Sequence, residues 1–250
     1  AGPLVGAPLH APDIHGVSGL DGPTLPEPRS EVAETPAAHA IVAAAHAHDA
    51  LWLVPTGPLT NVALALHLDP TIATRLAGIS LMGGSRSYGN TTPAAEFNIL
   101  ADPEAADVVF RSGANLLMAG LDLTHQFRLG ATHVADLQAT ESEVGRFTAD
   151  LLEFFLHAYE ARSGLPSAPM HDPCAVLALT RPDLFEREAT HVAVELRGAL
   201  TRGMTLCDLR EPHMRSTPNA TVLTRIDAER AWQELLSALR EPPQARGASA

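Results

Sequence analysis

The feature that most constrains the fold is a repeated order of apolar segment, polar loop and helix-like segment. The continuous apolar run at residues 51–54 and the mainly apolar segments at residues 79–82 and 115–119 have the character of short strands. Helical patterns follow at residues 60–67 and 102–111. Buried apolar strands that alternate with helices indicate a mostly parallel sheet with helices on its faces. We therefore predict an α/β fold built on an open, mostly parallel sheet.

The remaining segments extend this pattern without an internal repeat or an interdomain linker, which predicts a single domain over residues 1–250. Residues 1–28 are rich in Pro and Gly and are expected to be irregular. The tail at residues 241–250 is expected to fray. Further elements are predicted as helices at residues 35–49, 142–162, 170–179 and 227–240, and as strands at residues 191–196 and 204–209.

Composition excludes several classes of protein. A chain of 250 residues with 46% hydrophobic residues can bury a large core. The net charge of -12 comes without a basic cluster, so a nucleic-acid partner is not expected. No apolar run reaches the ~18–20 residues that a membrane helix needs. Cys174 and Cys207 form no zinc spacing or disulfide framework, which is typical of reduced thiols in a cytoplasmic protein.

Polar groups stand at three strand ends or helix starts. The carboxyl ends of parallel strands meet at one edge of a sheet, so separate loops can build one site there. Carboxylate, amide and carbonyl oxygens suit calcium or magnesium, and they also suit the hydroxyls of a sugar. The groups are Thr56, the loop at residues 81–103 with Asn90, Glu96 and Asn98, and the pair His171-Asp172.

Each of these groups also has a plainer interpretation. Asp172-Pro173 fits an N-cap followed by a first-turn proline. His171 fits a surface histidine or a hydrogen-bonded core histidine. Glu96 fits a solvated loop carboxylate, and Thr56 fits ordinary turn chemistry.

Taken together, the segments resemble the inosine–uridine-preferring nucleoside hydrolase family. The matching pieces stand in family order, and GNTTPAAEFN is the most specific of them. They are IHGVSGLDGP, LVPTGPLTNVALAL, LMGG, GNTTPAAEFNILADPEAA, GLDLTH and MHDP. The resemblance implies an N-glycosyl hydrolase of nucleoside salvage that cleaves ribonucleosides to base and ribose. It also implies a calcium ion that binds the attacking water and two ribose hydroxyls.

The resemblance assigns roles to matching positions. Asp172 and the backbone carbonyl of Thr56 would bind calcium. His171 would act as the catalytic residue that protonates the leaving base. His15 and Tyr159 are candidates for weaker base contacts. The ribose contacts would be Met82, Asn90, Glu96, Asn98 and Asp172.

The Asp-rich signature that opens the family pattern, roughly D-x-D-P-G-x-D-D, does not occur in this sequence. At ~30 residues per βαβ unit, on the order of 70 residues would precede Ala1, so we expect an N-terminally incomplete domain that lacks its first βα units. With one carboxylate and one carbonyl for calcium, this chain alone is expected to bind the ion weakly and to have little hydrolase activity.

A second hypothesis is a non-catalytic nucleoside- or ribose-binding protein. A nucleotide-dependent oxidoreductase is disfavoured, because no G-x-G-x-x-G follows a predicted strand. The resemblance also allows a homo-oligomer, since relatives commonly form dimers or tetramers. The sequence leaves open the choice between purine and pyrimidine nucleosides.

Overall fold

The computed structural model of the chain describes residues 2–28 and 30–240. The predicted frayed tail at residues 241–250 lies outside the described residues. Contacts divide the chain into two compact units. Among the described residues, unit 1 comprises residues 2–9, 31–126 and 170–226, and unit 2 comprises residues 10–28, 30, 127–169 and 227–240.

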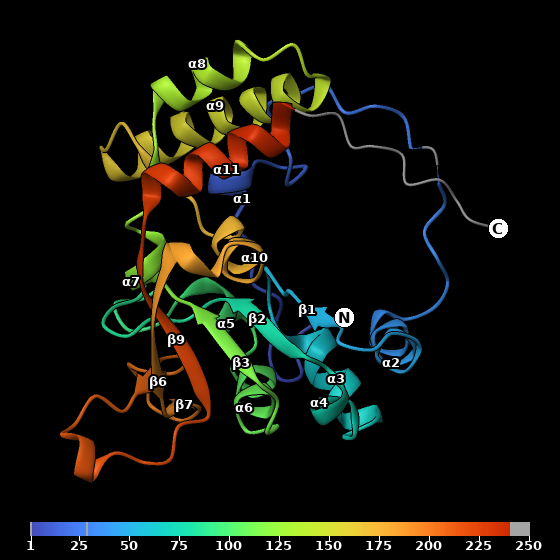
Figure 1. Cartoon of the computed structure of the whole chain (residues 1–250), viewed down its shortest axis with the longest axis vertical. Coiled ribbons are helices and arrows are strands. Elements are labelled where there is room, and N and C mark those ends of the chain that lie inside the picture. Colours follow the sequence, from blue (N-terminus) through green and yellow to red (C-terminus); the bar gives the residue numbers. More distant parts are fainter. Residues whose placement is uncertain (1, 29, 241–250) are drawn as a thin grey trace. The chain divides into compact units, whose positions relative to one another are not determined.

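Unit 1 contains a five-stranded sheet whose strands lie in the order β1-β2-β3-β9-β6 (Figure 1). The strands β1, β2, β3 and β9 run parallel to one another. The last strand, β6, pairs with β9 in the antiparallel sense. Every residue of β2 and β3 is buried, as expected for central strands covered on both faces. The prediction of a mostly parallel sheet is confirmed. The strands are β1 (Trp52–Leu53), β2 (Gly78–Met82), β3 (Leu116–Ala119), β6 (Phe185–Thr190) and β9 (Ala220–Ile226).

Helices cover both faces of this sheet. Figure 1 shows α3 and α6 on one face and α10 on the other. The side-chain hydroxyl of Ser80 in β2 donates to the carbonyl of Ala175 in α10 at 2.7 Å, in the buried interface. The helices are α2 (Ala37–Ala47), α3 (Thr60–Leu68), α4 (Ile72–Arg75), α5 (Phe97–Ala101), α6 (Pro103–Phe110), α7 (Leu121–Thr124) and α10 (Pro173–Thr180).

A separate antiparallel pair, β7 (Val192–Val194) with β8 (Thr205–Cys207), completes the regular strands of unit 1. These two strands were predicted, but they pair with each other and not with the five-stranded sheet. Short 3-10 turns occupy Pro182–Leu184 and Pro212–Met214.

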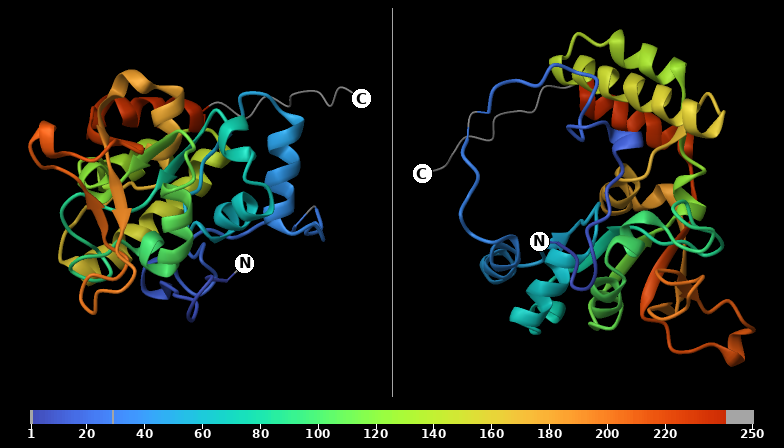
Figure 2. Two further views of the ribbon diagram at one scale, coloured as in Figure 1. Left: turned by 90° about the horizontal axis from the view of Figure 1, so that it is seen from below. Right: turned by 180° about the vertical axis from the view of Figure 1, so that it is seen from behind.

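Unit 2 is mainly helical. The helices α8 (Ala131–Gln138), α9 (Glu143–Ser163) and α11 (Ala228–Arg240) pack against one another, which Figure 2 shows from behind. The indole N–H of Trp232 donates to Asp136 at 3.2 Å, which fastens α11 to α8. The unit also contains α1 (Pro12–His15) and an antiparallel pair, β4 (Arg128–Leu129) with β5 (Ala168–Pro169).

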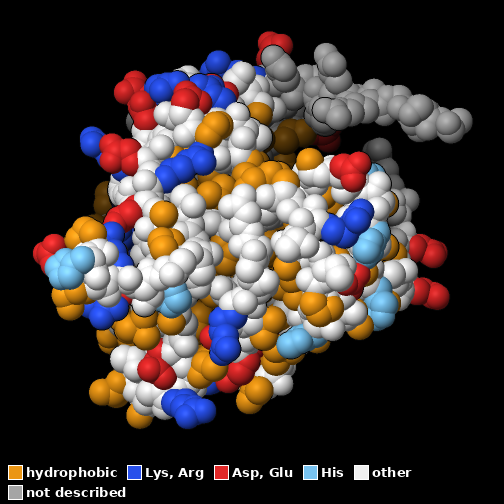
Figure 3. Space-filling model, turned by 60° about the horizontal axis from the view of Figure 1, so that its bottom comes forward, with side chains coloured by type: hydrophobic (Ala, Val, Ile, Leu, Met, Phe, Trp, Pro, Cys, Tyr) orange, Lys and Arg blue, Asp and Glu red, His pale blue; other side chains and the backbone are white. Residues whose placement is uncertain are grey.

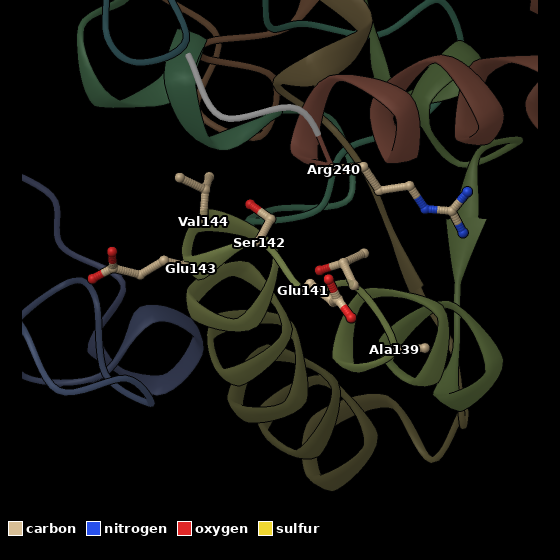
Figure 4. Close-up of a pocket in the computed structure, with 7 residues that line it drawn as sticks. Ala139, Glu141, Ser142, Glu143, Val144 and Arg240 are labelled. Atoms are coloured by element: carbon tan, nitrogen blue, oxygen red, sulfur yellow. The ribbon is translucent and has the colours of Figure 1, made fainter. Parts of the chain in front are cut away.

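A hollow in unit 2 lies between the turn from α8 to α9 and the last residue of α11, Arg240 (Figure 4). Two hydroxyl groups that line it, those of Thr140 and Ser142, form hydrogen bonds at the ends of α8 and α9. The Ser142 hydroxyl accepts from the backbone N–H of Gly145 at 3.3 Å, and the Thr140 hydroxyl donates to the Leu137 carbonyl at 2.7 Å. These groups cap local structure, so we assign no ligand to the hollow.

The face of the molecule in Figure 3 carries arginine side chains mixed with Asp and Glu side chains. Within residues 2–28 and 30–240, no helix is long and apolar enough to span a membrane.

The structure matches the predicted helices closely at α3, α6, α9 and α11. It also contains β6, β9, α1 and α8, which the sequence patterns did not predict. The prediction that residues 1–28 are irregular is wrong at α1. The predicted strand at residues 51–54 is shortened to Trp52–Leu53.

Asp102 is a fully buried carboxylate of unit 1 that accepts three hydrogen bonds. It caps α6 by accepting from the backbone N–H of Ala105 at 3.1 Å. Its other oxygen accepts from the Thr60 hydroxyl at 2.6 Å and from the backbone N–H of Leu4 at 2.9 Å. The carboxylate therefore ties α6, α3 and the N-terminal segment together.

We predict that Asp102→Ala lowers the free energy of unfolding by about 2–3 kcal/mol, because it removes a helix cap and leaves buried donors without a partner. Urea unfolding followed by circular dichroism measures this loss. Asp107→Ala, in the same helix but only half-buried, is the matched control and should cost less than about 0.5 kcal/mol. Equal losses in the two variants would contradict the assigned role of Asp102.

Candidate functional site

The loops that follow β1, β2 and β3 are joined by backbone hydrogen bonds. The N–H of Met82, at the end of β2, donates to the carbonyl of Pro55 after β1 at 3.0 Å. The N–H of Gly83 donates to the carbonyl of Ala119, the last residue of β3, at 3.2 Å. The strand ends thus converge at one edge of the sheet, as the sequence predicted.

Glu96 lies at this edge and is 3% exposed. It caps α5, and its Oε2 accepts from the backbone N–H groups of Gly84 at 2.9 Å and Ile99 at 3.2 Å. Burial raises the pKa of its carboxyl, the backbone donors oppose that shift, and the charge of Asp172 adds to it. Glu96 is therefore not a solvated loop carboxylate. It is a buried acid held in a fixed orientation.

Gly84 makes this arrangement possible. Its φ of +73° lies in the left-handed region, and an added Cβ would stand 2.8 Å from Met118 Cε and from Thr205 Cγ2. A side chain at this position would therefore clash and strain the backbone. Glycine lets the chain turn so that its N–H points at Glu96.

Asn98 connects two of the strand ends. Its buried side-chain amide donates to the carbonyl of Met82 at 3.0 Å and more weakly to the carbonyl of Thr56 at 3.4 Å. The same nitrogen lies 3.3 Å from the sulfur of Met82. The structure thus brings three predicted site residues, Thr56, Met82 and Asn98, into direct contact.

Asn90 lies on the exposed part of the loop between β2 and α5. Its Oδ1 accepts from the backbone N–H of Phe97 at 3.0 Å and from the Thr91 hydroxyl at 3.2 Å. These bonds close the loop and place Asn90 next to the segment that carries Glu96.

Asp172 occupies the N-cap position of α10 but does not cap it. Its backbone is helical, and its side chain makes no capping hydrogen bond, in contrast to Asp102 before α6. The capping interpretation of Asp172 is therefore wrong. The carboxylate is open to solvent, yet nearby protein atoms desolvate it and raise its pKa to about 6. The charge of Asp172 adds to the raised pKa of Glu96, which indicates that the two carboxyls lie near one another.

His171 is fixed by groups that follow β3. Its Nδ1 lies 2.7 Å from the Oγ1 of Thr124, which is fully buried. Its ring centroid lies 5.6 Å from that of His125, with 53° between the planes. His125 in turn places its Nδ1 2.9 Å from the Tyr88 hydroxyl. His171 is therefore a hydrogen-bonded histidine at the same sheet edge and not a loose surface residue.

The two predicted base contacts belong to unit 2. Tyr159 lies in α9, where the Arg128 guanidinium carbon stands 5.5 Å from its ring centroid. His15 ends α1, and its side chain lies outside the described part of the structure. Both base contacts stay predictions.

The sequence patterns missed Thr124, His125 and Tyr88 as members of this site. The available signal was the segment GLDLTH, which follows an apolar run with strand character just as the Thr56 loop does. A hydroxyl and an imidazole after a parallel strand could have been placed at the common edge on that ground.

Comparisons with known proteins show the family of the chain. Residues 1–233 match the family described as inosine-uridine preferring nucleoside hydrolase. The pyrimidine-specific ribonucleoside hydrolase RihA of Shewanella woodyi is 42% identical over 227 residues, which span 90% of this chain and 72% of that protein. The protein of the same description from Citrobacter koseri is 43% identical over 230 residues, which span 91% of this chain and 73% of that protein.

Solved structures show the same likeness. A purine-preferring ribonucleoside hydrolase from Gardnerella vaginalis superimposes with a TM-score of 0.85 at 32% identity, covering 92% of this chain and 73% of that one. The plant nucleoside hydrolase PpNRh1 also gives 0.85, at 30% identity, covering 94% and 76%. The chain therefore belongs to the inosine-uridine preferring nucleoside hydrolase family and is, by homology, an N-glycosyl hydrolase.

Proposed function

We propose that this chain acts on pyrimidine ribonucleosides and releases the free base and ribose. The observation that carries the proposal is the convergence of Glu96, Asn98 and the Thr56 carbonyl at the ends of β1 and β2, together with the contact of His171, the neighbour of Asp172, with Thr124 after β3. The pyrimidine preference follows the relatives from Shewanella and Citrobacter, whose descriptions are pyrimidine-specific.

The ribose would lie at this edge of the sheet. Carboxylate and amide oxygens accept hydrogen bonds from sugar hydroxyls, and the fixed geometry of Glu96 and Asn98 would orient them. The residues proposed to contact ribose are Met82, Asn90, Glu96, Asn98 and Asp172.

Cleavage of the N-glycosidic bond would depend on stabilising the charges that develop on the base and on the ribose. When the N-glycosidic bond breaks, its electron pair leaves with the base and positive charge develops on the ribose ring. The buried Glu96 carboxylate would stabilise that charge, and burial strengthens the interaction. His171 would give a proton to the departing base, a water molecule would add its hydroxyl to the ribose, and the remaining proton of that water would return to His171 through solvent.

The family resemblance also implies calcium, which would supply an activated, oriented water when bound. Calcium prefers 6–8 oxygen ligands. Within the described residues, no three His, Cys, Asp or Glu side chains gather so as to hold a metal ion. Asp172 and the Thr56 carbonyl supply two oxygens, and Glu96 Oε2 already accepts two backbone N–H groups. These residues do not fit a complete calcium site, so we derive no step through the ion.

A second candidate function follows from the same observation. Two proposed calcium ligands, beside groups proposed to hold a ribose, would suit a protein that binds a nucleoside or ribose without cleaving it. Binding of ribose without any turnover of uridine would select this candidate.

We further propose a cytoplasmic role in nucleoside salvage, with the nucleoside as the partner molecule and a homo-oligomer as the assembly. Both cysteines, Cys174 and Cys207, are free thiols, which suits a reducing compartment.

The ribose site is tested by isothermal titration calorimetry with D-ribose. We predict that Asn98→Ala weakens binding by about tenfold or more, because two carbonyls at the strand ends lose their donor. Asn115→Ala is the matched control, since Asn115 also donates to a carbonyl, that of Ala77 at 3.0 Å, away from the site. The affinity of Asn115→Ala for D-ribose should stay within about twofold of that of the unchanged chain. Equal affinities of both variants and the unchanged chain would contradict the site.

The metal and the reaction are tested together with the purified 250-residue chain. We predict a calcium dissociation constant of about 10⁻⁴ M or weaker, because few oxygens are provided. Uridine should be cleaved about 10²–10⁴-fold more slowly than by an enzyme with a complete catalytic set. The residual rate should vanish in Glu96→Gln and His171→Ala. Submicromolar calcium affinity, or turnover in the ordinary range of about 1–10³ s⁻¹, would overturn this prediction.

A further inference from the structure

Tyr88 and His125 lie beside His171, and the proposed reaction gives them no role. Their rings are 5.5 Å apart with 39° between the planes, and the Tyr88 hydroxyl lies 2.9 Å from His125 Nδ1. Tyr88 is 40% exposed and His125 is half-buried. The rings of Tyr88, His125 and His171 thus form a continuous row, which we call the ring row.

The outer end of the ring row is firmly anchored. The backbone N–H of Ser85 donates to the Thr205 hydroxyl at 2.8 Å, and that hydroxyl donates to the Ser85 carbonyl at 2.6 Å. The Ser85 hydroxyl donates to Asp122 at 2.9 Å and accepts from the backbone N–H of Tyr88 at 3.0 Å. Tyr88 therefore projects from a turn that is fixed on two sides.

At the inner end of the ring row lies His171, and the orientation of its ring decides which nitrogen faces the leaving base. The terminal torsion of a histidine side chain is broad and roughly two-fold, so the contacts of the ring decide which nitrogen points where. Thr124 holds Nδ1 of His171 at 2.7 Å, and a half-turn of the ring would carry that nitrogen away from the buried hydroxyl. The tilted His125 ring lies against His171 and limits that rotation.

We propose that Tyr88 and His125 are positioning residues, which hold the His171 ring so that Nδ1 stays on Thr124 and Nε2 serves the leaving base. Tyr88 fixes His125 through its hydroxyl, and His125 fixes His171 through ring contact. The inference rests on the proposed function, because it gives His171 the leaving base as its substrate group.

The first test reads ring orientation without any turnover. Long-range ¹H–¹⁵N correlation spectra of the histidine side chains are recorded for the full chain and for Tyr88→Phe, His125→Ala and the control His67→Ala. His67 is an exposed histidine at the end of α3. We expect Tyr88→Phe to shift the nitrogens of His125 and to shift or broaden those of His171. His67→Ala should leave the signals of His171 unchanged.

The second test compares leaving groups. Uridine needs help to release its base, whereas 4-nitrophenyl riboside releases a stable anion that needs no proton. Tyr88→Phe and His125→Ala should lower kcat for uridine by about tenfold or more, with KM nearly unchanged, because misplacing a catalytic group by 1 Å is this costly. The rate with 4-nitrophenyl riboside should stay within about twofold of the unchanged chain. Tyr88→Phe keeps the ring and is expected to preserve the fold.

The outcomes separate the two proposals. Unchanged His171 signals in both Tyr88→Phe and His125→Ala would overturn the positioning role. Equal loss of rate with both substrates would also overturn it, because it would indicate a merely structural effect. If the unchanged chain cleaves neither substrate, the hydrolase proposal fails while the nitrogen spectra still decide the positioning of His171.

Discussion

The side-chain amide of Asn98 holds together the ends of two parallel strands, and much of the site depends on this link. Its two acceptors are the carbonyl of Met82, the last residue of β2, and the carbonyl of Thr56, which follows β1. Parallel pairing brings the two carbonyls to one edge, and a short helix start at Glu96 places the amide between them. The site is therefore a consequence of strand direction, and the loops add the specific chemistry.

Buried carboxylates are the costly part of this arrangement. Taking a charge out of water disfavours folding unless hydrogen bonds replace the lost solvation. Asp102 receives three such bonds and stabilises the scaffold. Glu96 receives backbone donors as well, but its pKa remains raised. This contrast suits a structural role for Asp102 and, for Glu96, the proposed role of stabilising positive charge that develops on the ribose.

The parallel sheet was predictable because it rests on a local pattern, in which apolar segments alternate with polar loops and helical segments. The interior strand β9 and the edge strand β6 were not, because β6 carries three consecutive charged residues, Glu186 to Glu188, and its partner β9 lies 30 or more residues away in the chain. Local sequence also could not separate Asp102 from Asp172, since both precede a proline that begins a helix. Only the backbone conformation decides that the first caps its helix and the second does not.

The convergence of groups on one edge was predictable from strand order, whereas the contacts of His171 were not. Thr124 and His125 reach it across more than 40 residues of chain, and ring orientation depends on packing that no spacing rule encodes. The motif GLDLTH placed residues 120–125 among the segments that resemble the family. It did not predict that Thr124 and His125 contact His171.

The most direct measurement of the central claim is a D-ribose titration of the isotopically labelled chain, followed by amide NMR. The backbone signals of Gly84 and Ile99, which donate to Glu96, and the side-chain amide of Asn98 should shift together with one dissociation constant. Shifts confined to other places, such as the turn at residues 139–144 in unit 2, or the absence of any shift at these three residues, would contradict the account.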